Sequence, residues 1–96
     1  DLKRIRNVAK NNYELGKKHY ELGNFDDAVF RFKLVTWFDA GQAAGWHWLG
    51  KSYIAADKVP QAKAALRKAL ELKPDLQEAK DLLKSASEVK VAAGAK

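Results

Sequence analysis

Few side chains in this sequence could carry out catalysis or bind a metal: His19, His47, Ser52, Ser85 and Ser87. Histidine transfers protons near neutral pH and ligates metals, but the two histidines are expected to point in different directions. The serines have no assembled histidine and acid in the sequence that would activate one of them as a nucleophile. Because the 96-residue chain has no cysteine, thiolate metal sites are excluded as well. We therefore expect a non-catalytic chain with neither a metal nor another cofactor.

The stretch GWHWLGKSY, residues 45–53, places two of the three tryptophans on either side of a histidine. In a helix successive residues turn by about 100°, so Trp46 and Trp48 would point about 200° apart. One side has the i, i+3, i+4, i+7 spacing of a buried helix face, and it consists of Trp46, Leu49, Gly50 and Tyr53. We expect Trp46 to pack in the core and Trp48 to lie on another face with His47 and Lys51.

An internal repeat positions these residues. Leu15-Gly16-Lys17 recurs as Leu49-Gly50-Lys51, an offset of 34 residues, and each copy predicts two helices. In the first copy a helix over 12–22 ends at Gly23-Asn24, where Asn24 can cap the next helix. In the second copy the break is Asp57-Lys58, with Pro60 in the first turn of the following helix. A fifth helix is predicted over 75–91.

Small residues recur at equivalent places of the two copies, with glycines at 16 and 50 and alanines at 28 and 62. We expect neighbouring helices to approach one another closely at these positions. Such a unit cannot bury its apolar face alone.

These features resemble the tetratricopeptide repeat (TPR), a 34-residue helix–turn–helix unit. The second copy follows the family pattern at Trp46, Leu49, Gly50, Tyr53, Ala62, Leu66, Ala69 and Pro74. The first copy is looser, since Asn12, His19 and Ala40 replace the tryptophan, tyrosine and proline. The resemblance implies an all-α, right-handed α-α superhelix of about five helices. The expected organisation is an N-terminal helical flank (1–8), repeat 1 (9–42), repeat 2 (43–76), a capping helix (75–91) and a frayed tail (92–96).

The resemblance also implies a concave groove lined by the first helix of each repeat. The expected groove residues are Tyr13, Lys17, Tyr20, His47, Trp48 and Lys51. Rings beside ammonium groups suit a protein or peptide segment with acidic and apolar residues, so we expect a protein-interaction scaffold. The alternative is that Trp48 packs on a neighbouring domain or on the C-terminal helix.

Some TPR domains grip a terminal carboxylate with a clamp of lysine, asparagine and arginine. The matching positions here are Tyr13, Lys17, Trp48, Glu78 and Leu82. Only Lys17 is basic, so recognition of chaperone C-terminal tails is disfavoured.

A second apolar stripe lies on the helix FDDAVFRFKLVTWFD. Phe30, Leu34 and Trp37 have helical spacing on the side roughly opposite the inward residues Phe32 and Val35. Exposed apolar patches usually mark an interface. The expected cover is a second copy of the chain, a neighbouring domain, or the N-terminal residues Leu2, Ile5 and Val8, and homo-oligomerisation is the alternative function.

The net charge of +6 is concentrated at the two ends of the chain. Clustering rather than total charge makes a nucleic-acid footprint, so RNA binding through Lys3, Arg4, Arg6 and Lys10 is a further but less favoured alternative. No stretch is long and apolar enough to span a membrane. The compartment stays undetermined, with the cytoplasm slightly favoured, and the absence of methionine suggests a piece of a longer protein.

Overall fold

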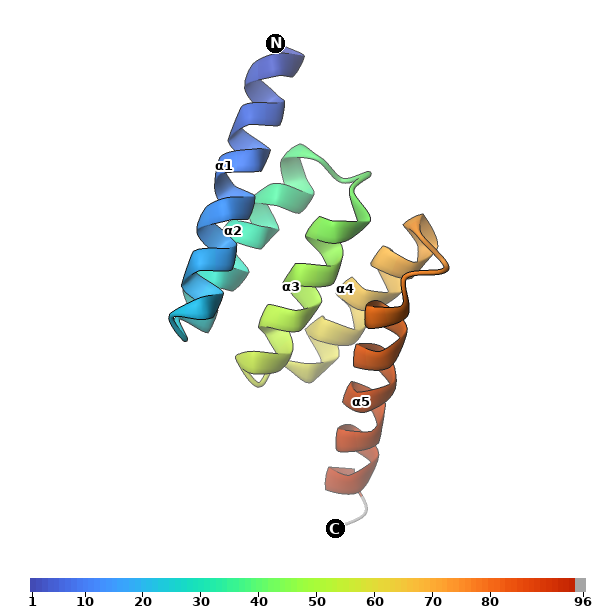
Figure 1. The fold of residues 1–96 in the computed structure, drawn as a ribbon. Helices are drawn as coiled ribbons and strands as arrows, with labels where there is room; N and C mark the ends of the chain where they lie inside the picture. The colour runs from blue at the N-terminus through green and yellow to red at the C-terminus, as the bar shows by residue number, and fades with distance from the viewer. Residues whose placement is uncertain (95–96) are drawn as a thin grey trace.

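The fold consists of helices packed in chain order (Figure 1). The computed structural model describes the backbone of residues 1–94 and the side chains of residues 1–88. Its helices are α1 (Leu2–Glu21), α2 (Phe25–Phe38), α3 (Ala43–Ala55), α4 (Val59–Leu72) and α5 (Gln77–Gly94). The predicted all-α repeat fold is confirmed.

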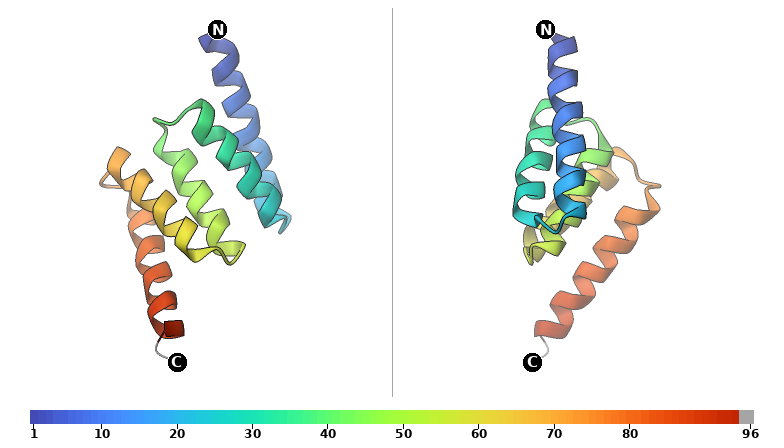
Figure 2. Two further views of the ribbon diagram at one scale, coloured as in Figure 1. Left: turned by 180° about the vertical axis from the view of Figure 1, so that it is seen from behind. Right: turned by 60° about the vertical axis from the view of Figure 1, so that its left-hand side comes forward.

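Two layers of helices form the molecule. Helices α1, α3 and α5 lie nearer the viewer in Figure 1, and α2 and α4 come to the front when the molecule is seen from behind in Figure 2. Each helix packs on the next one in the chain, and α3 also contacts α1 and α5 within the first layer. The arrangement is elongated, with extents of 51 × 29 × 17 Å.

The two hairpin turns have the same geometry in both repeats. Gly23 has a φ of +81°, and Asp57, which lies 34 residues later, has a φ of 63°. The Asn24 amide donates to the His19 carbonyl at 2.8 Å, and the Lys58 amide donates to the Tyr53 carbonyl at 2.8 Å. These backbone bonds satisfy carbonyls at the helix ends. The Asn24 side chain makes no capping hydrogen bond, contrary to the expectation.

Close packing between α1 and α2, and between α3 and α4, depends on glycine. A Cβ at Gly16 would lie 2.8 Å from the Phe32 ring, and one at Gly50 would lie 2.6 Å from Leu66 Cγ. Phe32 and Leu66 are fully buried at these contacts. The expected close approach at both glycines is confirmed.

Both ends of the chain are more helical than the repeat pattern indicates. Helix α1 begins at Leu2, with the Asp1 side chain accepting a hydrogen bond from the Lys3 amide at 3.0 Å. The flank is therefore continuous with the first repeat helix, and it projects beyond α2 in Figure 1. Helix α5 continues to Gly94, into the segment expected to fray, and residues 95–96 lie outside the described part of the chain.

Candidate partner-binding groove

A cluster of aromatic and cationic side chains joins α1 and α3. Helix α1 contributes Tyr13, Lys17 and Tyr20, whose spacing of four and three residues puts them on one face of the helix. Helix α3 contributes Trp48 and Lys51. The Tyr20 and Trp48 ring centroids are 5.5 Å apart with an edge-to-face geometry. Five of the six predicted groove residues are thus brought together, and we call these five the aromatic groove.

The lysines of the aromatic groove lie on its rings. Lys51 Nζ is 4.5 Å from the centroid of the Trp48 ring and 5.2 Å from that of Tyr20. Lys17 Nζ is 5.3 Å from the Tyr13 centroid. Cation–π contacts at an exposed site contribute about 0.5–1 kcal/mol each. They hold the ammonium groups beside the rings.

The rings of the aromatic groove are anchored to the core. Trp48 stacks on the fully buried Phe32 with centroids 5.6 Å apart and planes at 24°. Tyr13 meets Phe32 edge to face at 5.9 Å. Trp48 itself remains partly exposed. Packing on the core therefore fixes the position of the Trp48 ring.

Trp46 lies on a different side of α3, as its angular position predicts. Its indole N–H donates to the Ala40 carbonyl at 2.8 Å. It packs against the core but is only half-buried, because it borders a surface hollow with Trp37 and Tyr53. The expectation that Trp46 packs in the core is therefore confirmed, although the side chain is not fully buried.

The prediction that His47 lines the groove is wrong, because its side chain is buried. Helix α5 packs over its ring, leaving the residue 6% exposed, with Nε2 3.2 Å from Glu78 Oε2. The pair is close enough for an ion pair but is not aligned as a hydrogen bond. Burial lowers the pKa of His47 from its ordinary value of 6.5; Glu78 raises it and Lys51 lowers it, and the net direction is downward. The sequence predicts the angular position of His47 on α3, but that angle does not indicate that α5 covers the side chain.

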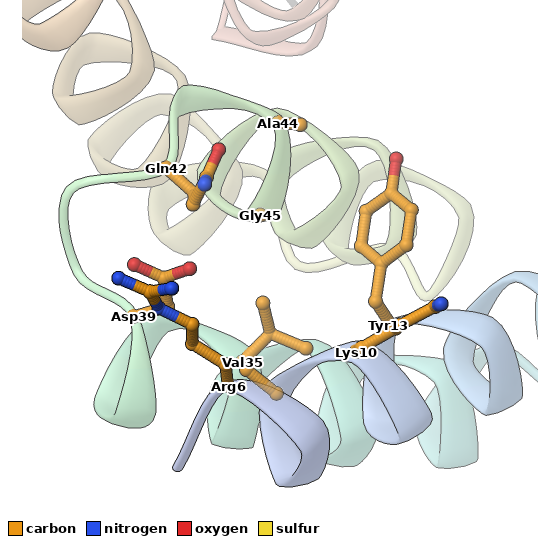
Figure 3. Close-up of a pocket in the computed structure, with 9 residues that line it drawn as sticks. Arg6, Lys10, Tyr13, Val35, Asp39, Gln42, Ala44 and Gly45 are labelled. Carbon is orange, nitrogen blue, oxygen red and sulfur yellow. The ribbon is translucent and has the colours of Figure 1, made fainter. Parts of the chain in front are cut away.

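A cleft at the N-terminal end of the groove was missed by the sequence analysis. It has a volume of about 300 Å³ and lies between α1 and the start of α3 (Figure 3). Its lining includes Arg6, Lys10 and Tyr13 from α1, with Val35 at its base and Ala44 on the opposite wall. The continuation of the α1 spacing back through Lys10 to Arg6 could have indicated the α1 wall, whereas the opposite wall depends on how the α2–α3 loop folds.

The second predicted surface is partly open to solvent. Phe30 is 56% exposed and Trp37 is 79% exposed, whereas Leu34 is half-buried. Among the described residues, Leu2 and Ile5 do not provide the expected cover, because they line a separate hollow with Phe38.

Other site types receive no support from the described residues. No group of three or more His, Asp or Glu side chains is placed to hold a metal ion within the described part of the chain. No described helix has both the length and the hydrophobicity needed to cross a bilayer.

Comparison with known proteins agrees with this architecture. The family model described as "Tetratricopeptide repeat" matches residues 43–76. No curated protein sequence matches the chain significantly. Among solved structures, the first TPR of Spaghetti (RPAP3), bound to the HSP90 peptide SRMEEVD, is similar with a TM-score of 0.60 and 18% sequence identity, covering 88% of this chain and 94% of that chain. Residues 43–76 are therefore a tetratricopeptide repeat, set in a chain that has the fold of a TPR domain.

Proposed function

We propose that the chain is a non-catalytic protein-interaction module that binds a segment of a partner protein in the aromatic groove. The observation that carries the proposal is the contact of Lys51 with both Tyr20 and Trp48, which joins α1 and α3 into one surface. The TPR fold supports it, since the similar domain of Spaghetti was solved with a peptide bound.

The chemistry of the groove favours a segment with acidic and apolar residues. The faces of Tyr13, Tyr20 and Trp48 supply apolar contact area at a low entropy cost, because packing on the core already restricts them. Lys17 and Lys51 supply positive charge at the same surface, which orients carboxylates and steers their approach. A basic segment would meet both ammonium groups and bind poorly.

The ligand should differ from the HSP90 peptide of the Spaghetti complex. Of the five positions that match the family's carboxylate clamp, Lys17 alone is cationic here. Glu78 instead carries a negative charge, and it lies beside His47 at the edge of the groove. This carboxylate would repel the terminal carboxylate of such a peptide. We expect SRMEEVD to bind much more weakly than the preferred ligand.

Peptide binding to single-site variants tests the proposal. Short random peptides would be displayed, selected on the wild-type chain, synthesised and titrated by isothermal calorimetry. Trp48→Ala should weaken their binding roughly tenfold or more, because it removes a central aromatic anchor. Trp37→Ala is the matched control, since it removes an exposed tryptophan from α2.

A second variant guards against unfolding, because Trp48 packs on Phe32. Lys51→Glu reverses a charge at a half-buried surface position and leaves the core intact. It should also weaken the selected peptides, with an unchanged circular dichroism spectrum. Folded variants of both positions that bind as tightly as wild type would refute the groove as the binding site.

Homo-oligomerisation is a second candidate function, favoured by the exposure of Phe30 and Trp37. A dimer formed through this stripe, which also includes Leu34, would bury apolar surface that the described residues leave open. Sedimentation of the wild type should then show a concentration-dependent dimer that Trp37→Ala abolishes. A wild-type monomer at high concentration would rule out this candidate.

A further inference from the structure

The face of α1 that builds the aromatic groove continues toward the N-terminus of the chain. Arg6, Lys10, Tyr13, Lys17 and Tyr20 are separated by alternating steps of four and three residues, so they form one stripe along the helix. Its first two members lie beyond the aromatic groove and are both cationic. This stripe is therefore longer than the aromatic groove, and its N-terminal end is cationic rather than aromatic.

The cleft at this end has an apolar base and small residues on one wall. Ala9 and Val35 are 5% and 3% exposed. Ala44 and Gly45 form part of the opposite wall of the cleft, whose volume is about 300 Å³. Such a space can accept one side chain of a ligand, with its carbon atoms against the base.

Charge decides which side chain suits the cleft. Arg6 and Lys10 place two positive charges at the rim, and Asp39 places one negative charge there. The excess is one positive charge. Tyr13 and Gln42 add polar groups that can hydrogen-bond a carboxylate. A lysine or arginine would face two cations, whereas an aspartate or glutamate would complement the excess.

We infer that the cleft of Arg6, Lys10 and Tyr13 binds an acidic side chain of the same partner segment whose apolar residue contacts Tyr20 and Trp48 in the aromatic groove. This subsite rests on the proposed function, because Tyr13 belongs to both the cleft and the groove.

Helix geometry gives the spacing that the ligand must have. Lys10 and Tyr20 are ten positions apart on α1, which corresponds to about 15 Å at a rise of about 1.5 Å per residue. An extended peptide advances about 3.3 Å per residue. The acidic residue should therefore lie about four or five positions from the apolar residue that contacts the rings.

A charge-reversal experiment tests the subsite. The probes are the peptides selected on the wild-type chain, each also synthesised with its acidic residue changed from Glu to Gln or from Asp to Asn. The variant Arg6→Glu with Lys10→Glu changes two exposed residues of α1 and should keep the fold. The matched control is Lys3→Glu with Arg4→Glu, which makes the same charge change on the same helix. Neither of its residues lines the cleft.

The expected result is a loss of about tenfold in affinity for the acidic peptide on Arg6→Glu/Lys10→Glu. The amide peptide should lose much less on that variant, and the control should cost either peptide little. Equal affinities of the cleft variant and the control would overturn the subsite. If Trp48→Ala still weakens binding, the proposed groove survives that failure; if Trp48→Ala and Lys51→Glu also bind as wild type, the groove itself is wrong.

Discussion

Substitution of Gly50 by alanine should destabilise the fold at the contact that holds α3 in place. An added Cβ would lie 2.6 Å from Leu66 Cγ and 3.3 Å from the Ala62 carbonyl oxygen. Leu66 is fully buried, and the Ala62 oxygen belongs to the α4 backbone, so neither neighbour can move without shifting a helix. The clash would therefore shift α3 relative to α4, and α3 carries Trp48 and Lys51 of the aromatic groove.

The magnitude follows from two opposing terms. Overpacking of a tight contact costs about 1–3 kcal/mol, whereas replacing glycine by alanine within a helix contributes about 1 kcal/mol in favour of the variant. The overpacking should win, because Leu66 Cγ lies well inside normal contact distance of the added atom. We expect a net loss of about 1–2 kcal/mol in the free energy of unfolding.

Urea denaturation followed by circular dichroism would measure this loss. Gly41→Ala is the matched control, because a Cβ at Gly41 has no atom within 4 Å and its φ is not positive. The control should change stability by no more than about 0.5 kcal/mol. A Gly50→Ala chain as stable as the control would refute the close approach of α3 and α4 as the constraint on the groove.

Further variants test other contacts of the fold. Folding lowers the pKa of His47, so the unfolded chain binds a proton at this residue more readily than the folded chain does. The contribution of His47 to the free energy of unfolding is therefore present above pH 6.5 and is lost as the pH falls toward the folded pKa. Urea midpoints of wild type and His47→Gln should therefore converge or cross between pH 7.5 and about 5.5, and parallel pH profiles would contradict the assignment. Asp57→Gly should raise stability by about 0.5–1 kcal/mol in a thermal melt, since Asp57 has a φ of 63°, and a lowered melting temperature would show that the Asp57 side chain contributes something else. Asn12→Ala should cost about 1–2 kcal/mol in urea, because its side chain accepts a hydrogen bond from Arg31 Nη1 at 3.0 Å; an unchanged midpoint would mean that solvent replaces this bond without loss.

Local features of the sequence predicted the order of the helices and the places of the two hairpin turns. The equivalent breaks at Gly23 and Asp57 show the same left-handed backbone and the same closing hydrogen bonds. Turn geometry depends on a few adjacent residues, so a pattern of 34 residues can indicate it. The start of α1 was harder to place, because Leu2, Ile5 and Val8 extend the helix outside the repeat.

The candidate site could be predicted only in part from the sequence. Angles around one helix separated Trp46 from Trp48, and the structure places them in different surroundings. The same angles placed His47 beside Trp48 but could not show that α5 would cover it. They also could not show that the α2–α3 loop would bring Ala44 opposite Lys10 to form the cleft.

By itself, the sequence determined the helical repeat, its turns and the direction of each side chain around its own helix, because these depend on residues within a few turns of one another. Only the tertiary structure decided which of those side chains remain exposed. Helix α5 buries His47, whereas a cleft between α1 and the start of α3 leaves Arg6 and Lys10 accessible. The physical reason is that exposure depends on the helix that packs opposite, and its side chains come from positions far away in the chain.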